Sequence, residues 1–138
     1  MLMSPSDKGP RCLDITGQFL VIVRGTIYRQ SMHESTYFIL LALHEQSRHG
    51  YGIAKRAGEL SNGRVKLTAG TLYGALDRLV NQELIEVASE ERVEGRLRRN
   101  YRIIPKGRKA AAAESQRMRS IVEVSEPIIG LGPAGAMA

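Results

Sequence analysis

The feature that most constrains the fold is a change in the spacing of apolar residues near Glu83. Before Glu83, apolar residues recur at the three- and four-residue intervals that place side chains on one face of an α-helix: Leu72, Leu76, Leu79 and Val80. After Glu83, Ile85 and Val87 alternate with polar residues, as in a β-strand that buries one face. We therefore expect the chain to pass from helices to a hairpin at this point.

Two further helical segments are expected before this one. Ser35 is the expected N-cap of the first helix, which has a wide apolar stripe, and Gly50 in "SRHGYG" is expected to end it. A second, shorter helix is expected from about residue 51 to residue 60, closed by "SNG". Thr68 is the expected N-cap of the third helix.

The alternation that begins at Ile85 resumes at Leu97, Tyr101 and Ile103, with "ERVEGRLRRN" between the two runs. This pattern predicts a β-hairpin with a long, charged tip. Pro105 then begins a last helix, at a position where the missing N–H of proline costs nothing. Three helices, a hairpin and a helix, in that order, predict a mainly α (α+β) fold: a winged helix-turn-helix followed by a C-terminal helix.

The expected domain organisation follows from this order. Residues 32–104 are expected to form the winged helix-turn-helix, residues 105–125 the C-terminal helix, and residues 126–138, "PIIGLGPAGAMA" with the preceding Glu126, a disordered tail. Residues 1–31 differ in composition from the rest. We expect them to be a disordered or non-native extension, with Met32 as the true first residue.

Charge is concentrated in the second half of the chain. Residues 92–109 hold eight basic residues and one acid, Glu94, a net charge of +7, whereas the whole chain carries +6, so the remainder sums to about −1. A basic element on an otherwise balanced body is typical of a nucleic-acid binder, in which cations displace counterions from phosphates. The alternative is a hairpin that is merely well solvated.

The outer face of the third helix is short and polar in its first two turns. Gly70 and Gly74 lie in these turns, although glycine costs roughly 1 kcal/mol per site in a helix. We interpret the glycines as allowing close approach of DNA, because a recognition helix enters the major groove by its N-terminal part. The alternative is a helix that tolerates them. The other residues of this face are Thr71, Tyr73, Asp77, Arg78 and Asn81.

Two segments, "HGYGI" at 49–53 and "LTAGTLYGALDRLVNQELIE" at 67–86, resemble the PadR family of transcriptional regulators. The segment "EGRLRRNYRIIPKGR" at 94–108 resembles the wing of that family, and the resemblance covers about residues 36–121. Ala69 departs from a proline that is frequent in the family. The resemblance implies a winged helix-turn-helix homodimer, usually a repressor, whose C-terminal helix packs in the dimer interface.

The resemblance also implies which residues face DNA. These are Tyr51, Thr68, Gly70, Thr71 and Tyr73 in the helices and Arg96, Arg98 and Arg99 in the wing. The outer helix face adds Arg78, while Tyr73 is equally expected to be part of the core.

The expected dimer interface consists of Met118, Ile121 and Val122, which could instead line a ligand pocket. A small hydrophobic or aromatic effector is implied by the resemblance alone.

Several classes of function are disfavoured by what the chain lacks. Cys12 is the single cysteine, which excludes an internal disulfide and fits a reducing cytoplasm. The three histidines lack the spacing of a helical metal pair, so neither a metal nor another cofactor is expected. No apolar stretch is long enough for a membrane span. The pattern indicates no catalytic constellation, so we do not expect an enzyme.

The function expected from sequence is that of a sequence-specific DNA-binding regulator in the cytoplasm. Its partner would be double-stranded operator DNA, bound by a homodimeric repressor that a small-molecule effector releases. The alternative is a winged-helix module that binds protein and not DNA.

Overall fold

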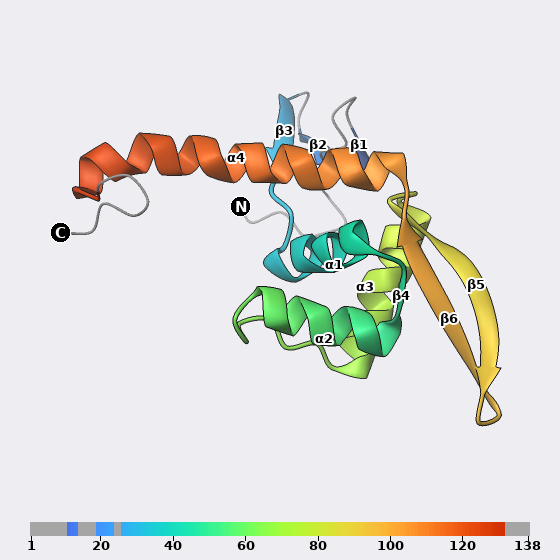
Figure 1. The fold of residues 1–138 in the computed structure, drawn as a ribbon. Coiled ribbons are helices and arrows are strands. Elements are labelled where there is room, and N and C mark those ends of the chain that lie inside the picture. Colours follow the sequence, from blue (N-terminus) through green and yellow to red (C-terminus); the bar gives the residue numbers. More distant parts are fainter. Residues whose placement is uncertain (1–10, 14–18, 24–25, 132–138) are drawn as a thin grey trace.

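The order of helices and strands follows the change of spacing seen in the sequence. The computed structural model describes residues 11–13, 19–23 and 26–131, with side chains from Ser31 onwards. The elements are β1 (Arg11–Leu13), β2 (Phe19–Val23), β3 (Thr26–Gln30), α1 (Glu34–Glu45), β4 (Arg48–His49), α2 (Gly50–Leu60), α3 (Ala69–Asn81), β5 (Ile85–Val93), β6 (Arg96–Ile103) and α4 (Pro105–Ile129). The fold is the expected mainly α winged helix-turn-helix, with β5 and β6 forming the wing (Figure 1).

Strands β1, β2 and β3 form an antiparallel sheet of their own, in that order. Residues 1–10, 14–18 and 24–25, which belong to the expected N-terminal extension, lie outside the described residues. The expectation that residues 1–31 do not belong to the folded unit stays a prediction.

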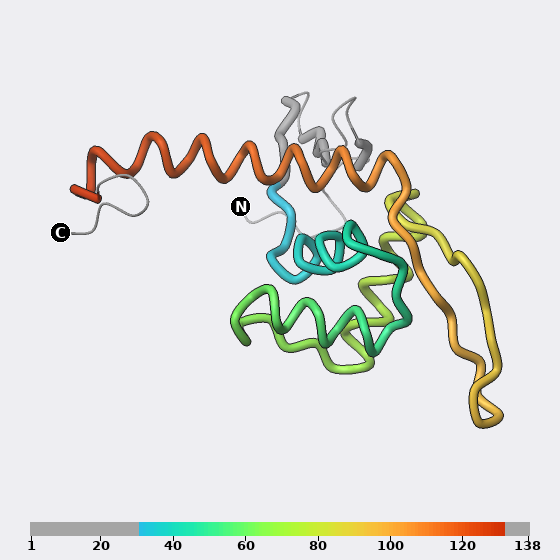
Figure 2. Tube along the Cα trace, in the orientation of Figure 1, coloured from blue at the N-terminus to red at the C-terminus, as the bar shows by residue number. Residues whose placement is uncertain are grey.

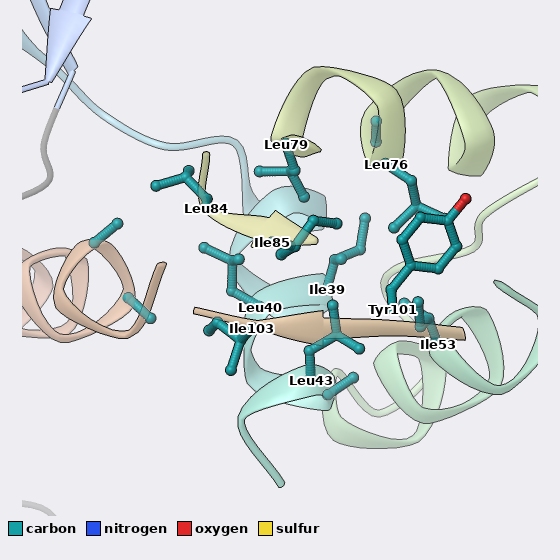
Figure 3. Packing of buried hydrophobic residues seen from close by; sticks show 14 of the residues in the cluster. Ile39, Leu40, Leu43, Ile53, Leu76, Leu79, Leu84, Ile85, Tyr101 and Ile103 are labelled. Atoms are coloured by element: carbon teal, nitrogen blue, oxygen red, sulfur yellow. The ribbon is translucent and has the colours of Figure 1, made fainter. Parts of the chain in front are cut away.

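One apolar core joins α1, α2, α3 and the base of the wing. Figure 3 shows its side chains converging from these elements, with Leu76 and Leu79 of α3 meeting the strands. Complete burial of each such side chain contributes roughly 1.5–3 kcal/mol, so the apolar stripe of α3 fixes that helix to the body. The largest fully buried side chains are Tyr101, Ile39, Leu40, Leu43, Ile53, Leu76, Leu79, Leu84 and Ile85.

A salt-bridge cluster on the surface ties α1 to α2. Arg56 of α2 donates hydrogen bonds to both carboxylate oxygens of Glu45, at 2.8 and 2.7 Å, and Arg48 donates a third at 3.0 Å. These bonds, the one from Arg56 first, lower the pKa of Glu45 to about 2. Glu45 therefore stays ionised in mildly acidic solution and holds the turn between the two helices.

The expected boundaries of α1 need two corrections. The helix begins two residues earlier than expected and its N-cap is His33, not Ser35, because the N–H of Tyr37 already bonds the His33 carbonyl at 3.0 Å. It ends at Glu45, and Gly50 does not stop it but begins α2. The reason is tertiary: Arg48 and His49 pair with β6 as the short strand β4, which the sequence did not reveal.

The wing is a regular hairpin, and its tip is shorter than expected. In the sheet order β4-β6-β5, β5 pairs with β6 from Ile85 opposite Ile103 to Val93 opposite Arg96, with a bulge between Val87 and Ser89. Glu94 and Gly95 make the turn, with φ of 52° and 77°. Two positive φ angles match a type I′ turn, which suits the twist of a two-residue hairpin. Most of the expected loop is therefore strand.

Helix α4 leaves the body and continues well past it (Figure 2). Its base is held by α1, where the hydroxyls of Tyr37 and Ser115 lie 2.5 Å apart. The helix ends at Ile129, four residues beyond the predicted end, because Pro127 is accommodated and Gly130 caps it with φ of 75°. Residues 132–138 of the expected tail lie outside the described residues.

No helix in the described part of the chain is both long enough and apolar enough to cross a bilayer.

Gly107 sets how closely α4 approaches the rest of the core. A Cβ at this position would lie 2.0 Å from the Leu84 carbonyl oxygen and 2.8 Å from Cγ1 of Ile103. We expect Gly107→Ala to lower the free energy of unfolding by about 2–3 kcal/mol, because backbone must move to relieve the overlap. Urea denaturation followed by circular dichroism measures this change.

The matched control is Gly74→Ala, also inside a helix, where the nearest atom to the new Cβ would be Arg78 Nη1 at 3.7 Å. This variant should be more stable than the wild type by roughly 0.5–1 kcal/mol, since alanine favours helix. Equal stability of the two variants would contradict the packing role of Gly107.

Candidate nucleic-acid interface

The N-terminal end of α3 and the tip of the wing point to the same side of the molecule, and α4 lies on the opposite side (Figure 1). Helix α3 keeps this orientation because Leu72, Leu76 and Leu79 are buried. Its other face, including Thr71 and Asp77, is exposed. The expected DNA-facing residues of α3 therefore lie on a free surface.

The first turn of α3 is capped from within. The Thr68 hydroxyl accepts a hydrogen bond from the N–H of Thr71 at 3.4 Å and donates one to the Thr71 hydroxyl at 3.0 Å. Thr68, Gly70 and Thr71 are all exposed, and a Cβ added to Gly70 would meet no atom within 4 Å. The protein itself therefore gives no packing reason for glycine at position 70.

Tyr73 lies partly against the body and partly in solvent. Its side chain is 50% exposed, yet its hydroxyl oxygen would lie only 2.9 Å from a Cβ placed on Gly50. The absence of a side chain at Gly50 thus makes room for the tyrosine against α2. Tyr73 both joins the two helices and presents one edge to solvent.

Tyr51 lies at the start of α2, next to this contact. It is 74% exposed, and its ring stacks on that of His49 with 6.4 Å between centroids and 14° between planes. His49 is held in turn as the N-cap of α2, because its Nδ1 accepts a hydrogen bond from the N–H of Gly52 at 3.2 Å. The capping residue of α2 therefore also stacks on the ring of Tyr51.

Three of the five arginines of the wing are ion-paired. Arg98 and Arg99 on β6 form ion pairs with Glu91 and Glu90 on β5, at 2.7 and 3.0 Å. Arg102 pairs with Glu86 in the same way, at 2.5 Å. The hydrogen bonds from Arg98 lower the pKa of Glu91, and that of Arg99 is raised by its bond to Glu90.

These pairs correct the charge argument made from sequence. The stretch 92–109 excludes the glutamates of β5, whereas the whole hairpin, residues 85–103, holds five arginines and four glutamates, a net charge of +1. The turn was the signal that could have predicted these pairs. A two-residue loop at Glu94 and Gly95 places residue 91 opposite residue 98, and residue 90 opposite residue 99. Counting charge along the chain ignored this cross-strand neutralisation.

Three other arginines form no ion pair within the described part of the chain. Arg92 and Arg96 flank the wing tip and Arg78 lies in the last turn of α3, and none of them pairs with a carboxylate in the described part of the chain. Among the expected DNA-binding arginines, Arg98 and Arg99 are each paired with a glutamate, whereas Arg78 and Arg96 form no ion pair with any described residue. Arg92 was not among the expected site residues.

The expected interface residues of α4 lie beyond the part that packs on the body. Ile121 and Val122 are 53% and 47% exposed, and Met118 is half-buried. The apolar surface includes exposed Val124 and continues through exposed Ile128 and Ile129. Structure and sequence thus agree that the end of α4 offers apolar side chains with no partner within the described chain.

No group of three or more His, Cys, Asp or Glu side chains is placed to hold a metal ion, as far as the described residues extend. The site consists of hydroxyls, amide groups and guanidinium groups.

Comparisons with known proteins agree with this architecture. A transcriptional regulator of Mycobacterium tuberculosis, Rv3488, is 35% identical over 86 residues, which cover 62% of this chain and 64% of that protein. A regulator from Clostridium thermocellum has a similar structure, with a TM-score of 0.52, 27% identity and coverage of 69% of this chain and 88% of that one.

A PadR family regulator from Clostridium difficile shares the fold, with a TM-score of 0.59 at 24% identity, covering 70% of this chain and 99% of that one. The sequence model of the transcriptional regulator PadR-like family matches residues 39–113, which include the core of the helix-turn-helix, the wing and the base of α4. The chain therefore belongs to the PadR-like family of transcriptional regulators.

Proposed function

We propose that this regulator binds operator DNA in a sequence-specific manner and represses transcription as a homodimer. The observation that carries the proposal is the open N-terminal face of α3, where Gly70 faces empty space beside exposed Thr68 and Thr71. A helix N-terminus with small side chains suits close contact with a duplex, because its free N–H groups and the helix dipole favour phosphate.

In the proposed complex the N-terminal part of α3 enters the major groove. Thr71 and the exposed edge of Tyr73 then reach base edges or phosphates, and Tyr51 at the start of α2 contacts the flanking backbone. The wing lies beside α3, so Arg96, Arg98 and Arg99 would contact phosphates or the adjacent minor groove. Arg78, in the last turn of α3, would contact backbone at the rim of the groove.

A homodimer is proposed from the end of α4. An exposed apolar stripe at the end of a long helix indicates a protein partner, and a second copy supplies an identical stripe. Two recognition helices would then bind half-sites roughly one helical turn apart.

We also propose a small hydrophobic or aromatic effector. A cavity of about 340 Å³ lies between α1 and α4. Apolar and aromatic side chains line one part of it, and two ion pairs line the rest: Met32, Tyr37, Phe38 and Met118, with Glu34–Arg64 and Glu114–Arg117. Because Met118 adjoins the proposed interface, a ligand here would favour one dimer geometry over another.

Repression by occupying an operator would need no catalytic step. A protein that binds operator DNA would act in the cytoplasm.

The first test concerns the wing. The double variant Arg98→Ala/Arg99→Ala should weaken binding to genomic fragments by about tenfold or more, because two phosphate contacts are lost and Glu90 and Glu91 are left unpaired near the duplex. The salt slope should fall by up to about 1, since both arginines are ion-paired in the free protein. Electrophoretic mobility shift at several KCl concentrations measures both effects.

The matched control is Lys109→Ala/Arg119→Ala, which removes the same charge from exposed positions of α4. It should bind DNA nearly as the wild type does. A wild-type protein that enriches no genomic site at moderate salt would instead favour the protein-binding module.

A second test separates stability from function at Gly70. Gly70→Ala should raise the free energy of unfolding by roughly 0.5–1 kcal/mol, because its Cβ meets nothing and alanine favours helix. The same methyl group should lower DNA affinity by obstructing close approach. Thermal unfolding and fluorescence anisotropy with a selected site measure the two effects, and unchanged affinity would remove the proposed reason for this glycine.

A third test concerns the dimer. Ile121→Asp/Val122→Asp should convert the protein to monomers, since burying two carboxylates in an apolar interface is strongly unfavourable. Gln116→Asp, at an exposed position of the same helix, is the control and should remain dimeric. Sedimentation velocity distinguishes the two states, and a wild type that is monomeric at all concentrations would disprove the homodimer.

A further inference from the structure

The cross-strand ion pairs of the wing form a group whose role is not explained by DNA contact alone. Arg98 donates two hydrogen bonds to one oxygen of Glu91, from Nε at 3.0 Å and from Nη2 at 2.7 Å. Arg99 Nε donates one to Glu90 at 3.0 Å. All four side chains are between 42% and 49% exposed, so the pairs are formed in the free protein and remain accessible to phosphate.

The register of the wing makes these pairs a property of the fold. Glu91 lies directly opposite Arg98, and Glu90 directly opposite Arg99. Opposite residues of an antiparallel pair have their Cβ atoms about 5 Å apart, which brings long charged side chains into contact. Each guanidinium must therefore leave a carboxylate, or share it, when it meets a phosphate.

We propose that Glu90 and Glu91 restrain the wing, so that DNA must displace them from Arg99 and Arg98, and that this exchange lowers affinity for non-specific DNA. The inference rests on the DNA-binding function proposed above. Binding through an exchanged pair yields only the difference between two similar ion pairs, and it leaves a bare carboxylate near the duplex. Only a site that also satisfies α3 overcomes this penalty.

Salt dependence provides a second signature of the exchange. A phosphate neutralised by a free arginine releases condensed cations, which gives a slope of about −0.9 per contact in a plot of log K against log salt. When the arginine leaves a carboxylate, that carboxylate takes up a cation and offsets part of the release. The wild-type wing should therefore show a shallower slope than its number of arginines suggests.

The hairpin contains its own control. Glu94, in the turn, forms no ion pair within the described chain, although it lies on the same element. Glu94→Gln removes one negative charge without freeing an arginine, whereas Glu91→Gln removes one and frees Arg98. Any difference between these two variants reports the restraint and not the net charge.

The test uses a fluorescein-labelled 30-base-pair duplex of mixed sequence and the full chain, with affinity measured by anisotropy from low to moderate KCl. Glu90→Gln/Glu91→Gln should bind roughly three- to tenfold more tightly than the wild type at low salt, with a slope steeper by up to about 1. Glu94→Gln should gain less than about twofold. Circular dichroism shows whether each variant keeps the fold.

A double-mutant cycle decides between restraint and simple repulsion. The gain from Glu91→Gln should be larger in the presence of Arg98 than in an Arg98→Ala background. Equal gains in both backgrounds would mean that Glu91 merely repels the duplex. Weaker binding of Glu91→Gln would mean that Glu91 instead orients Arg98 toward phosphate. Either result overturns the restraint but leaves DNA binding intact, whereas absence of wild-type binding would refute the proposed function itself.

Discussion

The arrangement of the molecule depends on the burial of the last residues of β6 against the helices. Tyr101 and Ile103 point into the core, and burial raises the pKa of the Tyr101 hydroxyl. The base of the wing is thereby packed against α3 in one apolar core. In the described part of the chain, this contact and not a side-chain hydrogen bond between α3 and the wing sets the positions of Arg98 and Arg99 relative to α3.

Much of the fold could be predicted because it depends on the spacing of apolar and capping residues that lie close together in the sequence. The apolar stripe of α3, the alternation in the wing and the proline that begins α4 each depend on residues close together in the sequence. The Thr68 cap is of the same kind. The exposed, polar face of α3 was predictable for the same reason, since fixing one face of a helix determines the other.

The rest could not be predicted because it depends on segments that meet only in the folded chain. Strand β4 exists because Arg48 and His49 lie along β6, and two residues alone give no strand signal. Gly50 resembled a helix stop, although its role is to accommodate Tyr73. The ion pairs of Arg98, Arg99 and Arg102 could be predicted only from the register of the hairpin. The long loop expected at the tip gave no such register.

The two-residue turn at the wing tip has a consequence for how such a wing can change in length. Because successive side chains of a strand face opposite sides, adding one residue to β5 or β6 would turn every side chain beyond it to the other face of the sheet. Such a change would separate Arg98 from Glu91 and turn the tip arginines away from their present side. Without a second bulge, a wing built on this turn therefore keeps both its cross-strand pairs and its faces only when each strand gains two residues. The number of residues added to each strand must therefore be even, so that the side chains near the tip stay on their present faces.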